Sequence, residues 1–365
     1  MVNVFVRQAF LSHDDAEREW ESAISAMPES VALWTAFLAR RRRAFSTYSV
    51  SANRALLGRA IGTFALQLDE WRGCAVHAAG AEAKEGALIL MLAHAAWAES
   101  SAGYTERAIG IFVALIEYNI FTPGELSGAP IAERASAFEE YWDSEAPRAG
   151  SSASEFGWRH WYAQSRGNTV PVVTVHDDVQ QAVPAKSSAN LDELADTVAH
   201  NPLRLMLSMW AHQEACLEDV DGTPILASQL PHEADADPER VVFAEDLKPY
   251  LVALYTHEAH VMLFLLSAAL LGVSGALKHL PTSHPLSVLV STAASTPEDL
   301  LPIHRSEQAS HICVVSNEKS PIHAGGPRVN KARQRKLAQR LLISACSLFP
   351  GESRVRALER RARWT

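Results

Sequence analysis

The sequence of 365 residues has few of the features that mark secreted or membrane-spanning proteins. Its four cysteines are far apart and form no C-x-x-C pair, which fits reduced thiols better than a disulfide framework. The N-terminal residues contain no continuous apolar core of the kind found in a signal peptide. The most apolar run, residues 261–273, is shorter than the roughly 18–20 residues that span a bilayer, and we expect a buried helix there. These absences predict a soluble intracellular chain with no membrane partner.

Basic residues are in the minority. The 33 Lys and Arg face 42 Asp and Glu, which gives a formal net charge of -9 and argues against a broad nucleic-acid-coating surface. Two local basic runs remain. The first, which we interpret as a solvated helix end with RNA or an acidic partner as the alternative, consists of Arg40, Arg41, Arg42 and Arg43. The second, a candidate nuclear-import signal or nucleic-acid contact, consists of Arg328, Lys331, Arg333, Arg335, Lys336 and Arg340.

Catalytic and metal-binding motifs are missing from the sequence. There is no phosphate-binding G-x-x-x-x-G-K-[ST] loop, and the Gly-rich segment at residues 272–275 lacks the spacing of a nucleophile elbow. His257 and His260 are three residues apart, whereas the zinc motif H-E-x-x-H separates its histidines by four, so we interpret them as ordinary polar-face histidines. The sequence therefore predicts no catalytic residue, no cofactor, no metal and no enzymatic activity.

Helical periodicity is abundant. Residues 83–101 place Leu88, Met91 and Leu92 on one face, and residues 104–121 carry a similarly wide apolar face. Gly103 between them suits the left-handed conformation that closes one helix before the next begins. Further helices are expected at 16–27, 30–43, 51–68, 191–199, 202–217 and 247–278, the last with a break near Tyr255. No segment of residues 10–160 alternates with the period of a strand.

A short sequence repeat favours stacked helix pairs over a simple bundle. Alanine stands five residues before proline at both 23–28 and 345–350, and successive helix pairs carry tryptophan. The predicted fold class is all-α: an α-α superhelix, or solenoid, with disordered insertions. We assign helical repeats to residues 10–165, a linker to 166–190, continued repeats to 191–280, a disordered insertion to 281–330, and a truncated repeat ending in a charged stub to 331–365.

An acidic and aromatic stretch of specific composition follows the helix pair of residues 83–121. Residues 138–150 are FEEYWDSEAPRAG, preceded by a helix stop at Pro123. We expect Trp142 to anchor this stretch on the helix pair.

The helix pair and the stretch after it resemble the NRDE family, described as nuclear-RNAi-defective or necessary for RNA interference. The helical units resemble its half-a-TPR (HAT) repeats, with Trp20, Pro28 and Trp34 in the positions of one unit. The resemblance covers residues 10–280, and more weakly 331–358. A second signature comprises residues 237–243 together with 245–247. The signature residues that we take as candidates for a partner surface are Trp142, Asp143, Ser144, Pro147, Arg148 and Gly150 in the first signature, and Asp237, Pro238, Glu239 and Arg240 in the second.

The resemblance implies a TPR-like HAT scaffold in the nucleus without catalytic activity or cofactors. It implies roles in small-RNA-mediated gene silencing and in RNA surveillance and processing. The implied partners are the RNA helicase of the nuclear exosome or spliceosome-associated proteins. Family members carry a charged N-terminal region that binds this helicase and has no match here, so we expect a partial or divergent member. Two alternatives stay open: a HAT scaffold of pre-mRNA splicing or 3′-end processing, and a direct RNA-binding module that uses the basic runs.

Overall fold

The computed structural model describes residues 13–43, 48–72, 80–150, 157–166, 241–273, 276 and 332–364. Within these ranges the regular elements are helices and no strand is present, so the all-α class is confirmed for this part of the chain. The superhelix of HAT repeats stays a prediction. Several other predictions lie outside the described residues: the linker beyond residue 166, the helices at 191–199 and 202–217, the insertion at 281–330, and Asp237, Pro238, Glu239 and Arg240.

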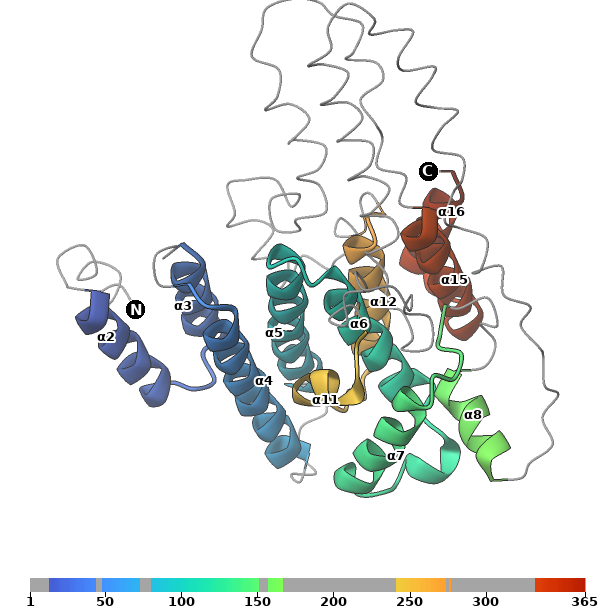
Figure 1. The fold of residues 1–365 in the computed structure, drawn as a ribbon, viewed down its shortest axis with the longest axis horizontal. Helices are drawn as coiled ribbons and strands as arrows, with labels where there is room; N and C mark the ends of the chain where they lie inside the picture. The colour runs from blue at the N-terminus through green and yellow to red at the C-terminus, as the bar shows by residue number, and fades with distance from the viewer. Residues whose placement is uncertain are drawn as a thin grey trace, which may run out of the picture.

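The N-terminal helices follow one another across the molecule in chain order (Figure 1). They are α2 (His13–Ala26), α3 (Val31–Arg43), α4 (Val50–Arg72), α5 (Ala81–Ser101) and α6 (Thr105–Ile120). Their buried residues recur at helical spacing: in α4, for example, Leu57, Ile61 and Phe64 are buried. Met27 departs from this pattern, since it follows the end of α2 and is 45% exposed. α2 packs on α3, and α4 and α6 both pack on α5, so that α5 and α6 are buried over most of their length.

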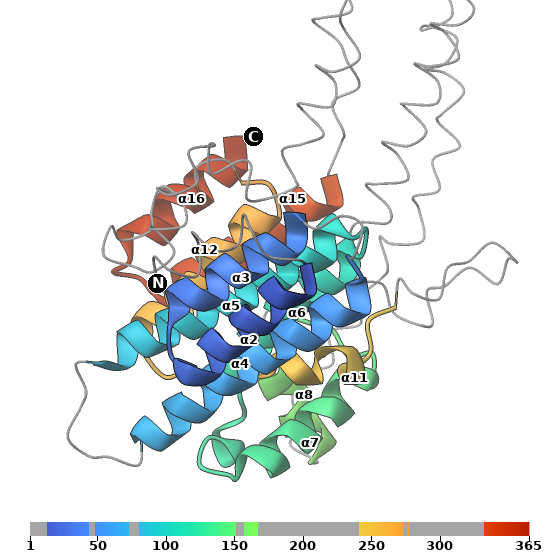
Figure 2. The same cartoon turned by 90° about the vertical axis from the view of Figure 1, so that its left-hand side faces the viewer.

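The later elements complete the described part of the molecule. They are η4 (Gly124–Leu126), α7 (Ile131–Asp143), α8 (Gly157–Ser165), α11 (Ala244–Leu247), η8 (Lys248–Tyr250), α12 (His257–Leu270), α15 (Ala332–Leu348) and α16 (Ser353–Trp364). The two views in Figures 1 and 2 place α15 and α16 at the end of the helical stack opposite α2. None of the described helices combines the length and the hydrophobicity that a membrane crossing requires.

Helix α12 is the centre of the C-terminal half. It packs against α5 and α6 on one side and against α15 on the other. Its residues from Val261 to Leu270 are all buried, because neighbours surround the helix. The apolar run at 261–273 is therefore the buried helix that its length predicts. In a strict solenoid each repeat contacts only its neighbours in sequence, whereas α12 contacts helices more than 130 residues earlier in the chain.

Two glycines end helices by the same hydrogen-bond pattern. After α5, Gly103 has φ of 96°, Tyr104 N donates to Glu99 O at 2.9 Å and Gly103 N donates to Ser100 O at 3.2 Å. After α12, Gly272 has φ of 80°, Val273 N donates to Ala268 O at 2.9 Å and Gly272 N donates to Ala269 O at 3.0 Å. These are Schellman motifs, in which glycine adopts the left-handed conformation at little cost. The segment at 272–275 thus begins with a helix cap.

The helix predicted at 247–278 is wrong over its first part and after Leu270, whereas the break predicted near Tyr255 is confirmed. Helix α11 ends at Leu247, a single 3-10 turn follows, and the chain then runs extended to Tyr255 before α12 begins. The cause is the buried carboxylate of Glu85, which accepts hydrogen bonds from Tyr255 N at 2.7 Å and Thr256 N at 2.9 Å. Thr256 Oγ1 in turn caps α12 by accepting from Ala259 N at 3.1 Å.

Two segments for which no helix was predicted are helical. The last residues, expected to be a charged stub, form α16, in which Val355, Leu358 and Ala362 are buried at helical spacing against α15. The acidic and aromatic stretch begins as the last turns of α7, because Phe138, Tyr141 and Trp142 share one buried face at i, i+3 and i+4. In both segments the spacing of the apolar residues gives the helix, although the charged residues between them obscure it.

Candidate functional site

The two signature segments, about 100 residues apart in the chain, meet in the fold. Trp142 Nε1 donates to Val242 O at 2.7 Å, and Asp143 Oδ1 accepts from Ala244 N at 2.9 Å, so it caps the start of α11. We call residues 138–150 together with 241–247 the signature junction. The first segment supplies side chains and the second supplies backbone groups. The junction therefore aligns one segment on the other through specific hydrogen bonds, in addition to apolar contact.

Two ion pairs stabilise the edges of the signature junction. Arg107 Nη2 of α6 lies 2.6 Å from Asp246 Oδ1, and Asp246 Oδ2 accepts from Phe243 N at 3.1 Å. Lys248 Nζ lies 3.1 Å from Glu139 Oε1, an exposed pair. The partly buried pair through Arg107 contributes more to stability than the exposed pair, which solvent screens.

Arg148 of the signature packs on Trp142. Its guanidinium carbon lies 3.7 Å from the centroid of the Trp142 ring, and its Nη2 donates to Trp142 O at 3.3 Å. Burial lowers the pKa of Arg148 from its ordinary value, although an arginine stays charged at physiological pH. The cation–π contact fixes the turn that follows α7 over the buried indole.

A buried carboxylate, Glu117 of α6, organises the residues beyond this turn. It is fully buried and accepts hydrogen bonds from Tyr141 Oη at 2.8 Å, from Trp158 N at 2.9 Å and from Ala149 N. Burial raises the pKa of Glu117, and the three hydrogen bonds, with the charge of Arg148, lower it in part. Burial, with the charge of Glu117 second, places the pKa of Tyr141 well above its ordinary value. Glu117 thus joins α6, α7, the Pro-Arg-Ala-Gly turn and the start of α8.

An aromatic cluster surrounds Glu117. The rings of Tyr118 and Trp158 are stacked with centroids 5.9 Å apart, and Phe138 meets Trp158 edge to face at 5.1 Å. Gly150 closes the segment with φ of 81°, and a Cβ there would lie 2.5 Å from Leu337 Cδ1 of α15. Glycine is needed at this position for its backbone conformation and for the close approach of α15. The signature residues Trp142, Arg148 and Gly150 are therefore packing residues.

The exposed side of the signature junction is what a partner can reach. Asp143, Ser144 and Pro147 of the signature are exposed there. The phenyl group of Phe243 is 49% exposed although its backbone belongs to the junction. A cavity of about 340 Å³ opens between α4, α6 and residues 245–250, with Arg54, Arg107, Glu245 and Tyr250 among its lining residues. Asp246, which accepts a hydrogen bond from Phe243 N, also lines it. Sequence reasoning missed Phe243 as a surface residue, because its apolar type suggests burial.

The first basic run is largely engaged within the fold. Arg40 Nη1 and Arg41 Nη1 lie 3.1 Å and 3.2 Å from the Glu17 carboxylate of α2, and the Arg42 guanidinium carbon lies 3.6 Å from the Trp97 ring centroid. The run ends a helix, as predicted, but these side chains are partly buried and join α3 to its neighbours. The structure describes the backbone of Arg43 and not its side chain.

The second basic run is only partly described. Arg328 and Lys331 lie outside the described residues, and Arg333 and Arg335 are placed only as backbone positions of α15. Lys336 is exposed and Arg340 is half-buried on the same helix. The two basic runs lie on helices at opposite ends of the stack, so the structure does not bring them together (Figure 1).

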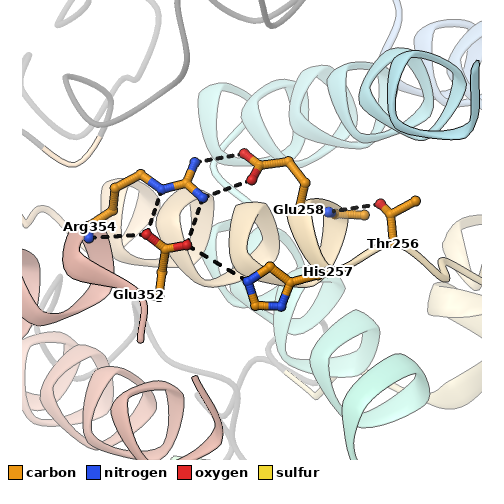
Figure 3. Close-up of polar contacts among 6 residues, drawn as sticks. Thr256, His257, Glu258, Glu352 and Arg354 are labelled. Atoms are coloured by element: carbon orange, nitrogen blue, oxygen red, sulfur yellow. Dashed lines mark hydrogen bonds and ion pairs between the residues drawn. The ribbon is translucent and has the colours of Figure 1, made fainter. Parts of the chain in front are cut away.

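One member of the histidine pair, His257, belongs to an ion-pair cluster that joins α12 to α16 (Figure 3). Arg354 donates to both oxygens of Glu258 at 2.7 Å and 2.8 Å, and to both oxygens of Glu352 at 2.8 Å and 2.9 Å. His257 Nε2 lies 3.8 Å from Glu352 Oε2, whereas His260 Nε2 lies 3.0 Å from Leu254 O. The two imidazoles thus have different partners, and no metal-binding group of three ligands occurs among the described residues.

Charge neutralisation in this cluster makes the docking of α16 sensitive to pH. The hydrogen bonds from Arg354 lower the pKa of Glu352 to about 2. Because the folded-state pKa is depressed, the stabilisation is fully present above the ordinary glutamate pKa and is lost as the pH falls from about 4.5 toward 2.

We expect Arg354→Met to destabilise the chain by about 1–3 kcal/mol at neutral pH, between the values for exposed and buried ion pairs. The variant leaves Glu258 and Glu352 facing each other without the cation between them. Urea unfolding at pH 7 and pH 3 measures the effect, and the difference between variant and wild type should shrink at pH 3. An equal difference at both pH values would show that Arg354 acts through packing alone.

Comparisons with known proteins agree with the signature. Residues 6–275 match the family model described as NRDE-2, necessary for RNA interference. Proteins named nuclear exosome regulator NRDE2 are 32% identical over 164 residues in Homo sapiens and 29% identical over 162 residues in Mus musculus. Each match covers 44% of this chain and 14% of the relative, so the chain matches only a small part of these longer proteins. No solved structure matches the chain significantly.

Proposed function

Because the chain belongs to the family described as NRDE-2, necessary for RNA interference, we propose that it regulates RNA surveillance in the nucleus by binding protein partners. The human and mouse relatives are named nuclear exosome regulators, which supports the nuclear exosome or its helicase as the partner. We propose further that the chain is a scaffold without catalytic chemistry. The described contacts at the signature junction are hydrogen bonds, ion pairs and aromatic packing within the fold.

The meeting of the two signature segments carries this proposal. Trp142 and Asp143 hold residues 242–244 in place, so the exposed Phe243 is presented at a fixed position two residues before Glu245, which lines the cavity. An exposed aromatic side chain on a rigid backbone loses little entropy on binding, and aromatic residues are enriched among the residues that dominate binding energy. We therefore place the partner surface on Phe243, Glu245 and the rim of the cavity.

Finer roles belong to the same proposal. HAT-type stacking of the helix pairs would give the curved surface on which such scaffolds bind partners. The family description, necessary for RNA interference, supports a role in small-RNA-mediated gene silencing. Heterochromatin formation is the consequence that we propose for this silencing. Spliceosome-associated proteins are the second class of partner, and they are distinguished by the same experiment.

We expect Phe243→Asp to abolish partner binding without unfolding the chain, because half of the ring is already in solvent. The matched control is Leu66→Asp on α4, where the side chain is 66% exposed. The tagged 365-residue chain and both variants are added to purified nuclear exosome with its RNA helicase, and co-purification is measured. Wild type and Leu66→Asp should retain the complex, and Phe243→Asp should lose at least about 90% of it, as expected for a residue worth about 1.4 kcal/mol or more.

Different outcomes separate the two parts of the proposal. If the wild-type chain retains neither exosome nor helicase, the regulatory role through direct contact is wrong. If all three chains retain the complex equally, the partner surface lies elsewhere. A parallel arm with purified spliceosomal proteins tests the second class of partner.

A further inference from the structure

The C-terminal hairpin of α15 and α16 has a charge opposite to that of the whole chain. Residues 332–364 contain nine Arg and Lys against two Glu, a formal charge of +7 in a chain of -9. The rest of the chain is therefore strongly acidic. The hairpin also lies outside the family match, which ends at residue 275. Such a concentration of one sign on two helices needs a physical explanation of its own.

The exposed charges form stripes along the helices. Arg356 and Arg360 are exposed at i, i+4 on α16, and on α15 the exposed Lys336 lies four residues before the half-buried Arg340. The side chain of Gln339 donates to the Ala362 carbonyl, so the middle of α15 lies against the end of α16. This antiparallel contact brings the Lys336–Arg340 stripe next to the last turns of α16, which also carry Arg361 and Arg363 in the sequence.

Among the described cations of the hairpin, Arg354 is neutralised by carboxylates of the fold. Arg354 is bound by Glu258 and Glu352, as Figure 3 shows, and serves to dock the hairpin on α12. Arg356 and Arg360 instead donate to the backbone carbonyls of Pro350 and Arg356. A backbone carbonyl carries no net charge, so these guanidinium groups keep their full positive charge toward solvent.

We propose that the α15–α16 hairpin binds the phosphate backbone of single-stranded RNA through Lys336, Arg340, Arg356 and Arg360. Phosphate contacts need regularly spaced cations and no pocket, which is what the described hairpin offers. A protein partner would be expected to use an aromatic anchor, whereas the large exposed apolar side chains described on the hairpin are the aliphatic Ile343 and Leu348. Binding should therefore be independent of sequence and weak, with a Kd of about 1–100 μM at physiological salt.

This site is independent of the proposed exosome contact, which lies on the signature junction. A scaffold with both sites could bind a protein partner and, on the hairpin, the RNA on which that partner acts.

The Gln-triple variant Lys336→Gln, Arg356→Gln, Arg360→Gln removes three of the four cations. The matched control, Arg18→Gln, Arg59→Gln, Lys248→Gln, removes the same charge from side chains that are 78%, 48% and 57% exposed on the acidic body.

The test is fluorescence anisotropy of a labelled oligouridylate of about 20 nucleotides with the 365-residue chain. Four phosphate contacts predict that log K falls against log salt with a slope of about -2.8, which is roughly a fifty-fold loss between about 50 and 200 mM. The Gln-triple variant should show a slope near -0.7 and bind at least about tenfold more weakly at low salt. The control should stay within about twofold of wild type, and circular dichroism should show equal helicity for all three.

Three results would overturn the proposal. One is wild-type binding that is absent or has a slope shallower than about -1, which leaves at most one phosphate contact. Another is equal binding by the Gln-triple variant and the control, because the effect would then be one of net charge. The third is found with labelled polyglutamate as the probe: salt-dependent binding of polyglutamate without binding of oligouridylate would assign the hairpin to an acidic protein.

Discussion

Trp142→Ala should lower the free energy of unfolding by about 3–5 kcal/mol, the cost of truncating a fully buried tryptophan. The indole is 1% exposed, and its Nε1 donates a hydrogen bond to Val242 O. Its ring centroid lies 5.7 Å from the Phe138 ring centroid and 3.7 Å from the guanidinium carbon of Arg148. Truncation of the indole leaves a cavity, removes the ring from the Arg148 guanidinium and leaves Val242 O without its hydrogen-bond donor. Equilibrium unfolding in urea measures the change.

Two variants separate the contributions of Trp142. Trp142→Phe keeps an aromatic ring and removes the Nε1 donor, so we expect a loss of about 1–2 kcal/mol. Phe243→Ala, in the segment that Trp142 holds, should cost less than about 1 kcal/mol because that ring is half exposed. A loss below about 1 kcal/mol for Trp142→Ala would mean that the indole does not hold the two signature segments together.

Glu117→Ala should be comparably damaging, by about 3–5 kcal/mol, although glutamate is normally a surface residue. The substitution leaves Tyr141 Oη, Ala149 N and Trp158 N without the buried acceptor that they share, at about 1–3 kcal/mol for each unpaired group. Glu117→Gln should cost less, because one amide oxygen remains and the buried charge is removed. Urea unfolding of both variants measures the difference.

The pH dependence of the free energy of unfolding reports on the ionisation of Glu117. Because burial raises its folded-state pKa, the folded chain holds this proton more tightly than the unfolded chain. Its contribution to stability is therefore largest below the unfolded pKa and decreases as the pH rises through the folded pKa, by at most about 1.4 kcal/mol per pH unit. Tyr141 does not titrate in this range, since its pKa is well above the ordinary value. Glu117→Gln should abolish this slope. An unchanged slope would assign it to other groups.

Apolar periodicity predicted much of the described fold. The buried face of α4 follows the spacing of Leu57 and Ile61, and the positive φ of Gly103 follows from its place between two amphipathic runs. These features depend on residues within a few turns of one another. The end of α7 also follows from local spacing, because Phe138, Tyr141 and Trp142 fall on one helical face. The charged residues between them obscured this spacing. The burial of α5 and α6 extends beyond the predicted faces.

The polar contacts could not be predicted in the same way. Glu85 fixes an extended segment 170 residues later, and Glu117 binds a turn and a helix start 32 and 41 residues later. A glutamate in a helix is expected in solvent, and nothing local distinguishes these two from the exposed ones. The resemblance identified the signature residues without giving their roles. The structure shows that Trp142, Arg148 and Gly150 pack the junction, whereas the exposed Phe243 lies beside them.

The most direct test of the regulatory role is the rate at which purified nuclear exosome with its helicase degrades a labelled RNA. We predict that a saturating amount of the wild-type chain or of Leu66→Asp changes this rate several-fold, whereas Phe243→Asp leaves it unchanged. A rate that is the same with and without saturating wild-type chain would contradict the account.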